Sequence, residues 1–131
     1  MKKNLKIIIV DDHRIYRKSL KRIIKKLYPE SHIQEAKDGL EFLRLLSYNE
    51  KIDLILMDVK MPVMDGVEAT GRALSINPTL KILAISIYND ENKQRMLAAG
   101  ALGFLQKGGD KYGIERAIST VLRGEIFINN I

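Results

Sequence analysis

Short aliphatic runs alternate with helical patterns along the whole chain, and no other feature of the sequence restricts the fold as much. The run at 5–10 is aliphatic at every position except Lys6, which is typical of a strand buried on both faces. Further runs predict strands at 32–36, 53–57, 81–86 and 101–106. Each strand is followed by a helical pattern, the first ending at Pro29 and the others covering about 40–47, 67–76, 90–99 and 112–123.

Five strand–helix units in 131 residues predict a parallel sheet with helices on both faces, because short crossover connections are right-handed. No linker, low-complexity segment or repeat interrupts the pattern. The sequence therefore predicts a single α/β domain, a doubly wound (βα)5 fold of the flavodoxin-like type. Polar residues at the strand ends favour a five-stranded sheet in the order 2-1-3-4-5, which leaves the second strand at an edge.

Composition removes several classes of protein. Hydrophobic residues make up 46% of the chain and charged residues 29%, which argues against disorder. The absence of cysteine excludes disulfides, thiolate metal sites and a cysteine nucleophile. The apolar runs are far shorter than the roughly 20 residues that span a bilayer, and the one near the N-terminus is too short for a signal peptide. We therefore expect a cytoplasmic protein that does not contact a membrane.

The first predicted helix carries much of the net charge of +6. Seven basic residues and no acidic one lie between Arg14 and Lys26. The apolar positions form one predicted stripe, made of Ile15, Leu20, Ile23, Ile24 and Leu27. The opposite face carries Arg14, Lys18, Lys21 and Lys25. A solvated face is the simplest interpretation, and a docking surface for an acidic partner is the alternative.

Charged and hydroxyl residues stand at the carboxyl ends of four predicted strands. Asp11 and Asp12 follow the first strand, Asp58 the third and Lys107 the fifth, and Ser86 closes the fourth. In the order 2-1-3-4-5 these ends converge on one cleft, where open parallel sheets bind their ligands. Taken singly, each residue has a simpler explanation, such as a helix cap or an exposed strand-end side chain. Their joint placement favours a functional site.

Three carboxylates in one cleft repel one another. Two of them about 4 Å apart repel by roughly 4 kcal/mol at an effective dielectric constant of about 20. The cluster therefore requires a bound cation or a proton, and Lys107 supplies only one positive charge. Mg²⁺ favours such an all-oxygen site, whereas the sequence offers no set of imidazole or thiolate ligands for zinc.

Four segments carry a resemblance to a known family. They are IIIVDDHRIYRKSL at 7–20, DLILMDVKMPVMDGVEA at 53–69, ILAISIYNDE at 82–91 and AAGALGFLQKG at 98–108. Over essentially its whole length the chain resembles a response-regulator receiver domain, and more closely those of the NarL/LuxR-type subgroup. The resemblance implies a receiver domain over 1–123. Residues 124–131 resemble the start of a linker toward a C-terminal helix-turn-helix effector domain, which these residues do not include.

This resemblance implies phosphoryl chemistry in the cleft. Asp58 would accept a phosphoryl group from a sensor histidine kinase. Asp11 and Asp12 would hold Mg²⁺ together with Asp58 and the backbone carbonyl of Lys60. Lys107 would contact the phosphoryl oxygens. The chain would assist its own phosphorylation and dephosphorylation without being a turnover enzyme.

Two further positions match the family's switch residues. Ser86 stands where the family has a Ser or Thr that moves to hydrogen-bond the phosphate, and Phe104 stands where it has an aromatic switch residue. A core aromatic of the fifth strand is an equally good interpretation of Phe104. The implied output is a changed surface of a transcriptional regulator, with a homodimer formed on phosphorylation and DNA bound only through the effector domain.

The sequence departs from the family pattern around the cleft. Ile87 follows Ser86 where a smaller residue is usual, and Lys60 and Tyr88 occupy the two variable positions that flank the site. Gly108 follows Lys107 in place of the proline often found there, which weakens the case for a cis peptide bond. These departures leave the lifetime of the phosphoryl group open.

Three other functions compete with this interpretation. A phosphatase with an aspartyl intermediate needs an acid at position 60, where Lys60 stands. A flavin or nucleotide site needs glycines or hydroxyls after the first strand, where Asp11 and Asp12 repel phosphate instead. A receiver-like adaptor that works without phosphorylation is the main alternative. Mg²⁺-dependent labelling by a small phosphodonor distinguishes it from a phosphoacceptor.

Overall fold

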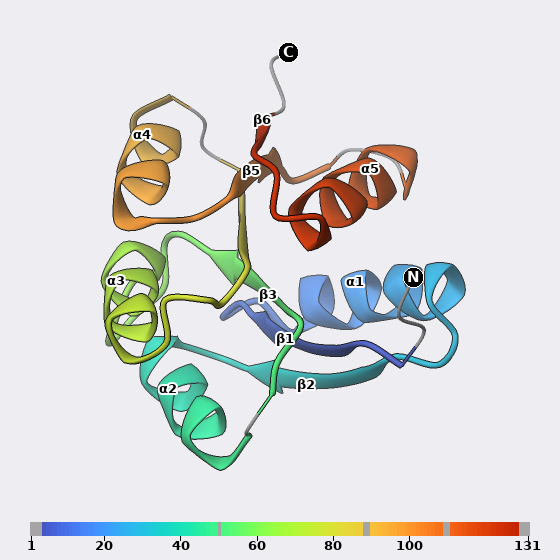
Figure 1. Ribbon diagram of the computed structural model, residues 1–131, viewed down its shortest axis with the longest axis horizontal. Coiled ribbons are helices and arrows are strands. Elements are labelled where there is room, and N and C mark those ends of the chain that lie inside the picture. The colour runs from blue at the N-terminus through green and yellow to red at the C-terminus, as the bar shows by residue number, and fades with distance from the viewer. Residues whose placement is uncertain (1–3, 50, 88–89, 109–110, 129–131) are drawn as a thin grey trace.

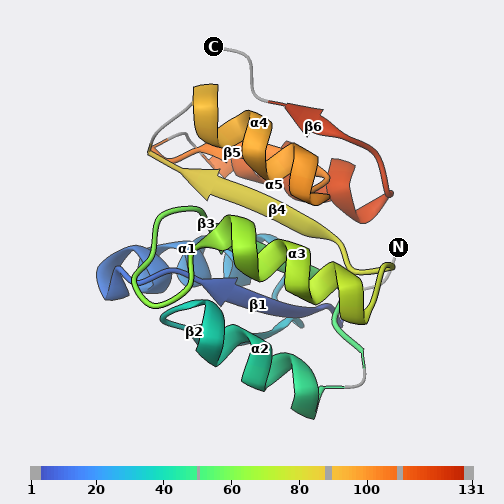
Figure 2. The same ribbon diagram turned by 90° about the vertical axis from the view of Figure 1, so that its left-hand side faces the viewer.

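The computed structural model describes residues 4–49, 51–87, 90–108 and 111–128. These residues form a parallel sheet of six strands in the order β2-β1-β3-β4-β5-β6, with five helices packed on it (Figure 1; Figure 2). The strands are β1 Lys6–Val10, β2 His32–Ala36, β3 Leu54–Asp58, β4 Ile82–Ser86, β5 Gly103–Gln106 and β6 Phe127–Ile128. The helices are α1 Arg14–Leu27, α2 Gly39–Tyr48, α3 Gly66–Ile76, α4 Asp90–Ala99 and α5 Lys111–Leu122.

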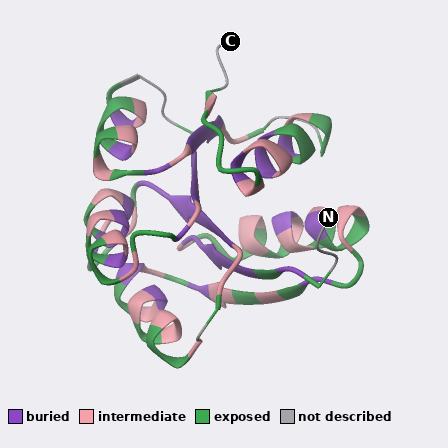
Figure 3. Cartoon of the chain, viewed as in Figure 1, coloured by how far each residue is buried: buried purple, intermediate pink, exposed green. Residues whose placement is uncertain are grey.

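Helices cover both faces of the sheet, with α2, α3 and α4 on one face and α1 and α5 on the other (Figure 1). Alternate residues of β1 point to opposite faces, so Ile8 joins the core beneath α2–α4 and Ile9 the core beneath α1 and α5. The strands β3 and β4 are buried along their whole length, whereas the edge strand β2 is partly exposed (Figure 3). Burial on both faces explains why the central strands are almost entirely apolar.

The predicted number of strands is wrong, because β6 adds a sixth strand beside β5. Phe127 and Ile128 pair in parallel with Gly103 and Phe104. Gly103 permits this close approach, since a Cβ at that position would lie 3.0 Å from the carbonyl oxygen of Phe127. Part of the segment 124–131, which the sequence suggested as the start of a linker, therefore extends the sheet.

The predicted apolar stripe of α1 is wrong at Ile15, which is 85% exposed. Ile15 lies five positions before Leu20, a rotation of about 140° around the helix at about 100° per residue. Tyr16, four positions before Leu20, packs against the core instead. Ile15 therefore lies on the outer face of α1 among basic side chains.

The other elements lie within about two residues of the ranges predicted from the sequence. Two aspartates define helix starts, because Asp38 accepts a hydrogen bond from the Glu41 amide at the start of α2 and Asp65 from the Glu68 amide at the start of α3. Among the helices of the described residues, none is both long and apolar enough to cross a bilayer.

Candidate functional site

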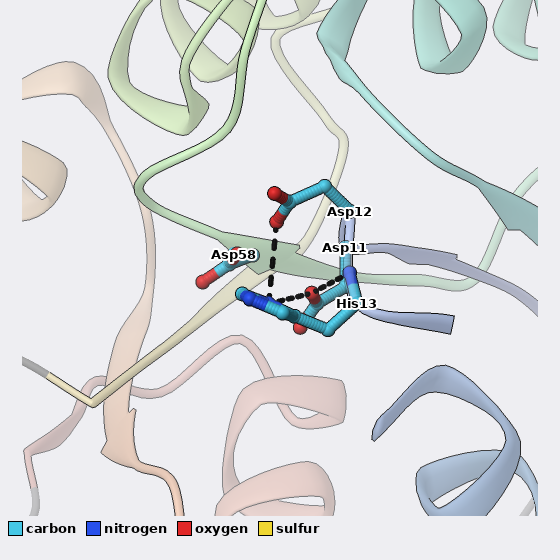
Figure 4. Close-up of side chains that lie close together, drawn as sticks. All are labelled: Asp11, Asp12, His13 and Asp58. Atoms are coloured by element: carbon cyan, nitrogen blue, oxygen red, sulfur yellow. Dashed lines mark hydrogen bonds and ion pairs between the residues drawn. The ribbon is translucent and has the colours of Figure 1, made fainter. Parts of the chain in front are cut away.

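The carboxyl ends of β1 and β3 bring four titratable side chains together (Figure 4). Asp11, Asp12 and His13 follow β1, and Asp58 is the last residue of β3. One candidate ligand atom from each side chain lies within 4.8 Å of the others. Because β1 and β3 are parallel neighbours, their carboxyl ends meet at the same edge of the sheet. Asp11 and Asp58 are buried there, whereas His13 is exposed.

Lys107 joins this acidic cluster from the end of β5. Its Nζ lies 2.7 Å from Asp11 Oδ2 and 3.4 Å from Asp58 Oδ1, and its side chain is only 8% exposed. The Lys107 amide donates a hydrogen bond to the Ser86 carbonyl over 2.8 Å, which ties the ends of β4 and β5 together. The structure thus brings together the aspartates, the lysine and the serine that the sequence placed at one cleft.

One ammonium does not balance the carboxylates of the cluster. Burial and then the charge on Asp11 raise the pKa of Asp58 to about 7, because the opposing effect of Lys107 is too small to cancel them. Asp12 Oδ1 is buried and accepts no hydrogen bond within the described part of the chain, although the His13 imidazole lies 3.3 Å from it. An oxygen-rich cluster with surplus negative charge suits a hard divalent cation. The residues present therefore fit such an ion.

His13 places an imidazole at the site, which the sequence analysis missed. Its Nδ1 lies 3.2 Å from Asp11 Oδ1 and 3.3 Å from Asp12 Oδ1 (Figure 4). The sequence analysis predicted no set of imidazole or thiolate ligands for zinc, and a single imidazole is not the ligand set that zinc prefers. Its position next to Asp12 in the sequence is the signal that could have identified it.

The simpler explanation of the aspartates as helix caps is also wrong. The N-cap residue of α1 is His13, which makes no side-chain capping bond, and Asp11 Oδ1 accepts the His13 amide over 2.8 Å. The N-cap residue of α3 is Asp65, not Asp58. Neither Asp11 nor Asp58 is used to begin a helix.

Arg17 connects the site to the edge strand β2. Its Nη1 donates to the Asp11 carbonyl over 2.6 Å, and its Nε donates to Glu35 Oε1 over 3.0 Å. Lys18 and Lys21 pair with the same glutamate at 2.8 and 3.6 Å. Burial opposes ionisation of Glu35, but hydrogen bonds from Lys18 and Arg17 outweigh it and lower its pKa. Lys18 and Lys21 are therefore engaged within the chain, contrary to the expectation that they face solvent alone.

A cleft of about 180 Å³ opens over Asp58, lined by His13, Asp58, Lys60, Ser86, Ile87 and Lys107. Ser86 is buried at its edge, whereas Ile87 is 56% exposed. Phe104 is not among the lining residues and lies in the core beneath α2–α4. Tyr88 lies outside the described residues, and no peptide bond in the described ranges is cis.

The loop between β3 and α3 contains a strained residue. Val63 has a φ of +71°, and the Met64 amide donates to the Pro62 carbonyl across it, which makes a γ-turn. A β-branched residue with positive φ is a conformational outlier. Since its side chain is 77% exposed, no buried contact compensates for the strain.

We expect Val63→Gly to stabilise the protein by about 1 kcal/mol, because relief of strain outweighs the greater chain entropy of glycine. Urea unfolding measures the change. Val67→Gly is the matched control, because Val67 lies in α3, where glycine should cost at least about 1 kcal/mol. Equal destabilisation by both substitutions would contradict strain at Val63.

Comparison with known proteins is consistent with this geometry. The model of the response regulator receiver domain family matches residues 7–119. The chain therefore belongs to the response regulator receiver domain family. It is 36% identical over 128 residues to the transcriptional regulatory protein DegU of Brevibacillus brevis, which covers 95% of this chain and 53% of DegU.

Two further similarities support the NarL/LuxR-type assignment. The chain is 32% identical over 126 residues to the response regulator GacA of Pseudomonas syringae, covering 95% of this chain and 58% of GacA. A crystal structure of a LuxR family DNA-binding response regulator from Silicibacter pomeroyi superimposes with a TM-score of 0.84 at 28% identity, covering 96% of this chain and 98% of that chain. The chain thus spans little more than half the length of these curated relatives.

Proposed function

We propose that this chain is the phosphoacceptor domain of a two-component transcriptional regulator, with Asp58 as the acceptor. The observation that carries the proposal is the Lys107 ammonium held between Asp11 and Asp58 beneath an open cleft. A carboxylate oxygen of Asp58 would attack the phosphorus of a kinase phosphohistidine. The P–N bond would break, and its electron pair would stay on the imidazole.

The other residues of the cleft position groups and compensate charge. Asp11, Asp12 and Asp58, with the Lys60 carbonyl, would hold Mg²⁺. When bound, the ion would neutralise charge on the phosphoryl oxygens. Lys107 would contact the same oxygens. Such a domain assists its own phosphorylation and dephosphorylation and is not a turnover enzyme.

The phosphorylated Asp58 would carry about two negative charges, and Ser86 would move to hydrogen-bond them. A shift of Ser86 and of the buried Phe104 would change the packing of the β4–β5 side and hence the output surface. Homodimer formation and control of DNA binding by an effector domain after 124–131 would follow. The relatives, which are response regulators, make an adaptor that works without phosphorylation the less favoured function.

Intact mass measurement after incubation with acetyl phosphate and Mg²⁺ tests the proposal. We expect an adduct of about 80 Da that is absent when EDTA is present, because the carboxylate cluster needs a cation before a phosphoryl group can approach. Labelling that is equally fast with excess chelator would contradict the role of the metal. No labelling under either condition would favour the adaptor.

The outer face of α1 is the surface proposed to dock the kinase. Arg14 and Arg22 are exposed and, together with Ile15, line a groove there. Unlike Lys18 and Lys21, neither arginine pairs with Glu35 in the described structure. They are therefore the better probes of an acidic partner.

We expect Arg14→Glu with Arg22→Glu to slow phosphotransfer from a purified phosphorylated kinase by on the order of tenfold at low salt, and less at high salt. Acetyl phosphate should label the variant at the normal rate. Lys51→Glu is the control, since Lys51 is exposed near the amino end of β3, away from the cleft. Equal slowing with both donors would exclude a docking role.

A further inference from the structure

An aromatic side chain borders the site without belonging to the acidic cluster. Tyr16 lies in the first turn of α1, and Lys107 Nζ lies 4.4 Å from the centroid of its ring. A cation within about 6 Å of an aromatic ring face is attracted by the ring quadrupole. The Lys107 ammonium is therefore held both by two carboxylates and by an aromatic face.

The ring of Tyr16 is itself held in place by packing. It is half-buried against the hydrophobic core between the sheet and the helices α1 and α5. Burial and the nearby charge of Asp11 raise the pKa of its phenol, so the side chain stays neutral and adds no charge to the cleft. A fixed, neutral ring can attract an ammonium through its face, and it does not compete with the carboxylates for that ammonium as a phenolate anion would.

We infer that Tyr16 is a positioning residue for phosphoryl transfer, whose ring holds the Lys107 ammonium beside Asp58. This inference rests on the proposed function. The shortest contact of Lys107 is to Asp11, a carboxylate that a divalent cation would also engage. The contact with the ring does not depend on any carboxylate. It therefore keeps the positive charge in the cleft when Asp11 is engaged by another cation and an anionic phosphoryl group approaches.

A purely structural role makes a different prediction. Tyr16 lies four positions before Leu20 in the buried stripe of α1, so any apolar side chain of similar size would serve the packing. The two roles differ in whether the effect of removing the ring depends on Lys107. A cycle of Tyr16→Leu and Lys107→Met, measured singly and together, separates them.

The first measurement uses urea unfolding of the four proteins in EDTA, so it depends on neither metal nor phosphoryl transfer. We expect Tyr16→Leu to lower the equilibrium constant for folding about tenfold more when Lys107 is present than in the Lys107→Met background. Equal effects in both backgrounds would show that the ring only packs, and would overturn the inference.

The second measurement follows the rate of labelling by acetyl phosphate at saturating Mg²⁺. We expect Tyr16→Leu to be labelled about tenfold more slowly than the natural chain, and Tyr16→Phe at a rate within about twofold of the natural chain. In the Lys107→Met background, the labelling rates with and without Tyr16→Leu should be equal. Tyr16→Met replaces Tyr16→Leu if the latter does not fold. A normal rate for the variants without a ring, or a Tyr16→Phe rate as low as theirs, would overturn the inference. If the natural chain takes no phosphoryl group, the proposed function fails, while the unfolding cycle still tests the contact.

Discussion

Asp58→Asn is expected to abolish phosphorylation and, at the same time, to stabilise the metal-free protein at neutral pH. The stabilisation follows from the raised pKa of Asp58, about 7 in the folded chain. An unfolded aspartate ionises at a pKa of about 3.9, so the folded state disfavours the charge that the unfolded state accepts. Allowing for solvent screening in the cleft, we expect Asp58→Asn to raise the free energy of unfolding by about 2 kcal/mol at pH 7.5.

The raised pKa of Asp58 predicts the sign with which the stability gain from Asp58→Asn depends on pH. Because the folded pKa of Asp58 is raised, its ionisation reduces stability as the pH rises from about 4 to 7. The gain from Asp58→Asn should therefore be full above pH 7 and disappear near pH 4. Urea unfolding in EDTA across this range measures it, with Glu30→Gln, at an exposed position, as the control. A gain that does not change with pH, or an adduct of about 80 Da on the variant, would contradict the assignment.

The sequence predicted those parts of the fold that depend on burial along the chain. β1, β3 and β4 are apolar except at one end residue each, because both of their faces are covered. β6 gives only a weak signal, the three apolar residues 126–128, because so short a strand at the sheet edge is held by its pairing with Gly103 and Phe104 and by packing of Phe127 on the core. The sequence analysis assigned the apolar Ile15 to the buried face of α1 and left out Tyr16, whose polar hydroxyl is typical of a surface residue. In the structure Tyr16 continues the buried stripe and Ile15 is exposed.

The main residues of the candidate site could be predicted from the sequence because their positions depend only on the order of the strands. Strand order alone brings Asp11, Asp58 and Lys107 to one edge of the sheet. The contacts of Arg17 with Glu35 and with the Asp11 carbonyl depend on the angle at which α1 crosses β2. The contact of Tyr16 with Lys107 depends on the rotation of the same helix. Sequence patterns determine neither the crossing angle nor the rotation of α1, so neither contact could be predicted from the sequence.

The start of α3 fixes the position of Asp58 through Gly66. Its amide donates to the Val59 carbonyl over 2.7 Å, so the chain after β3 folds closely back on the strand. A Cβ on Gly66 would lie 2.1 Å from the carbonyl oxygen of Asp58. The atom in the way belongs to the backbone, and a backbone atom cannot turn aside as the end of a side chain can. Even one methyl group there must therefore displace β3 or α3.

We expect Gly66→Ala to destabilise the protein by about 2–4 kcal/mol and to slow labelling of Asp58 at least about tenfold, since small displacements of reacting groups are costly. Gly71→Ala is the matched control. Gly71 lies in the same helix, and no described atom lies within 4 Å of its added Cβ. Helix propensity alone predicts that both substitutions stabilise, by about 0.5–1 kcal/mol. Opposite signs in urea unfolding, a loss at Gly66 and a gain at Gly71, would show that the contact with the Asp58 backbone dominates. A gain at both positions would show that the loop can move away and that Gly66 does not hold the phosphoacceptor strand in place.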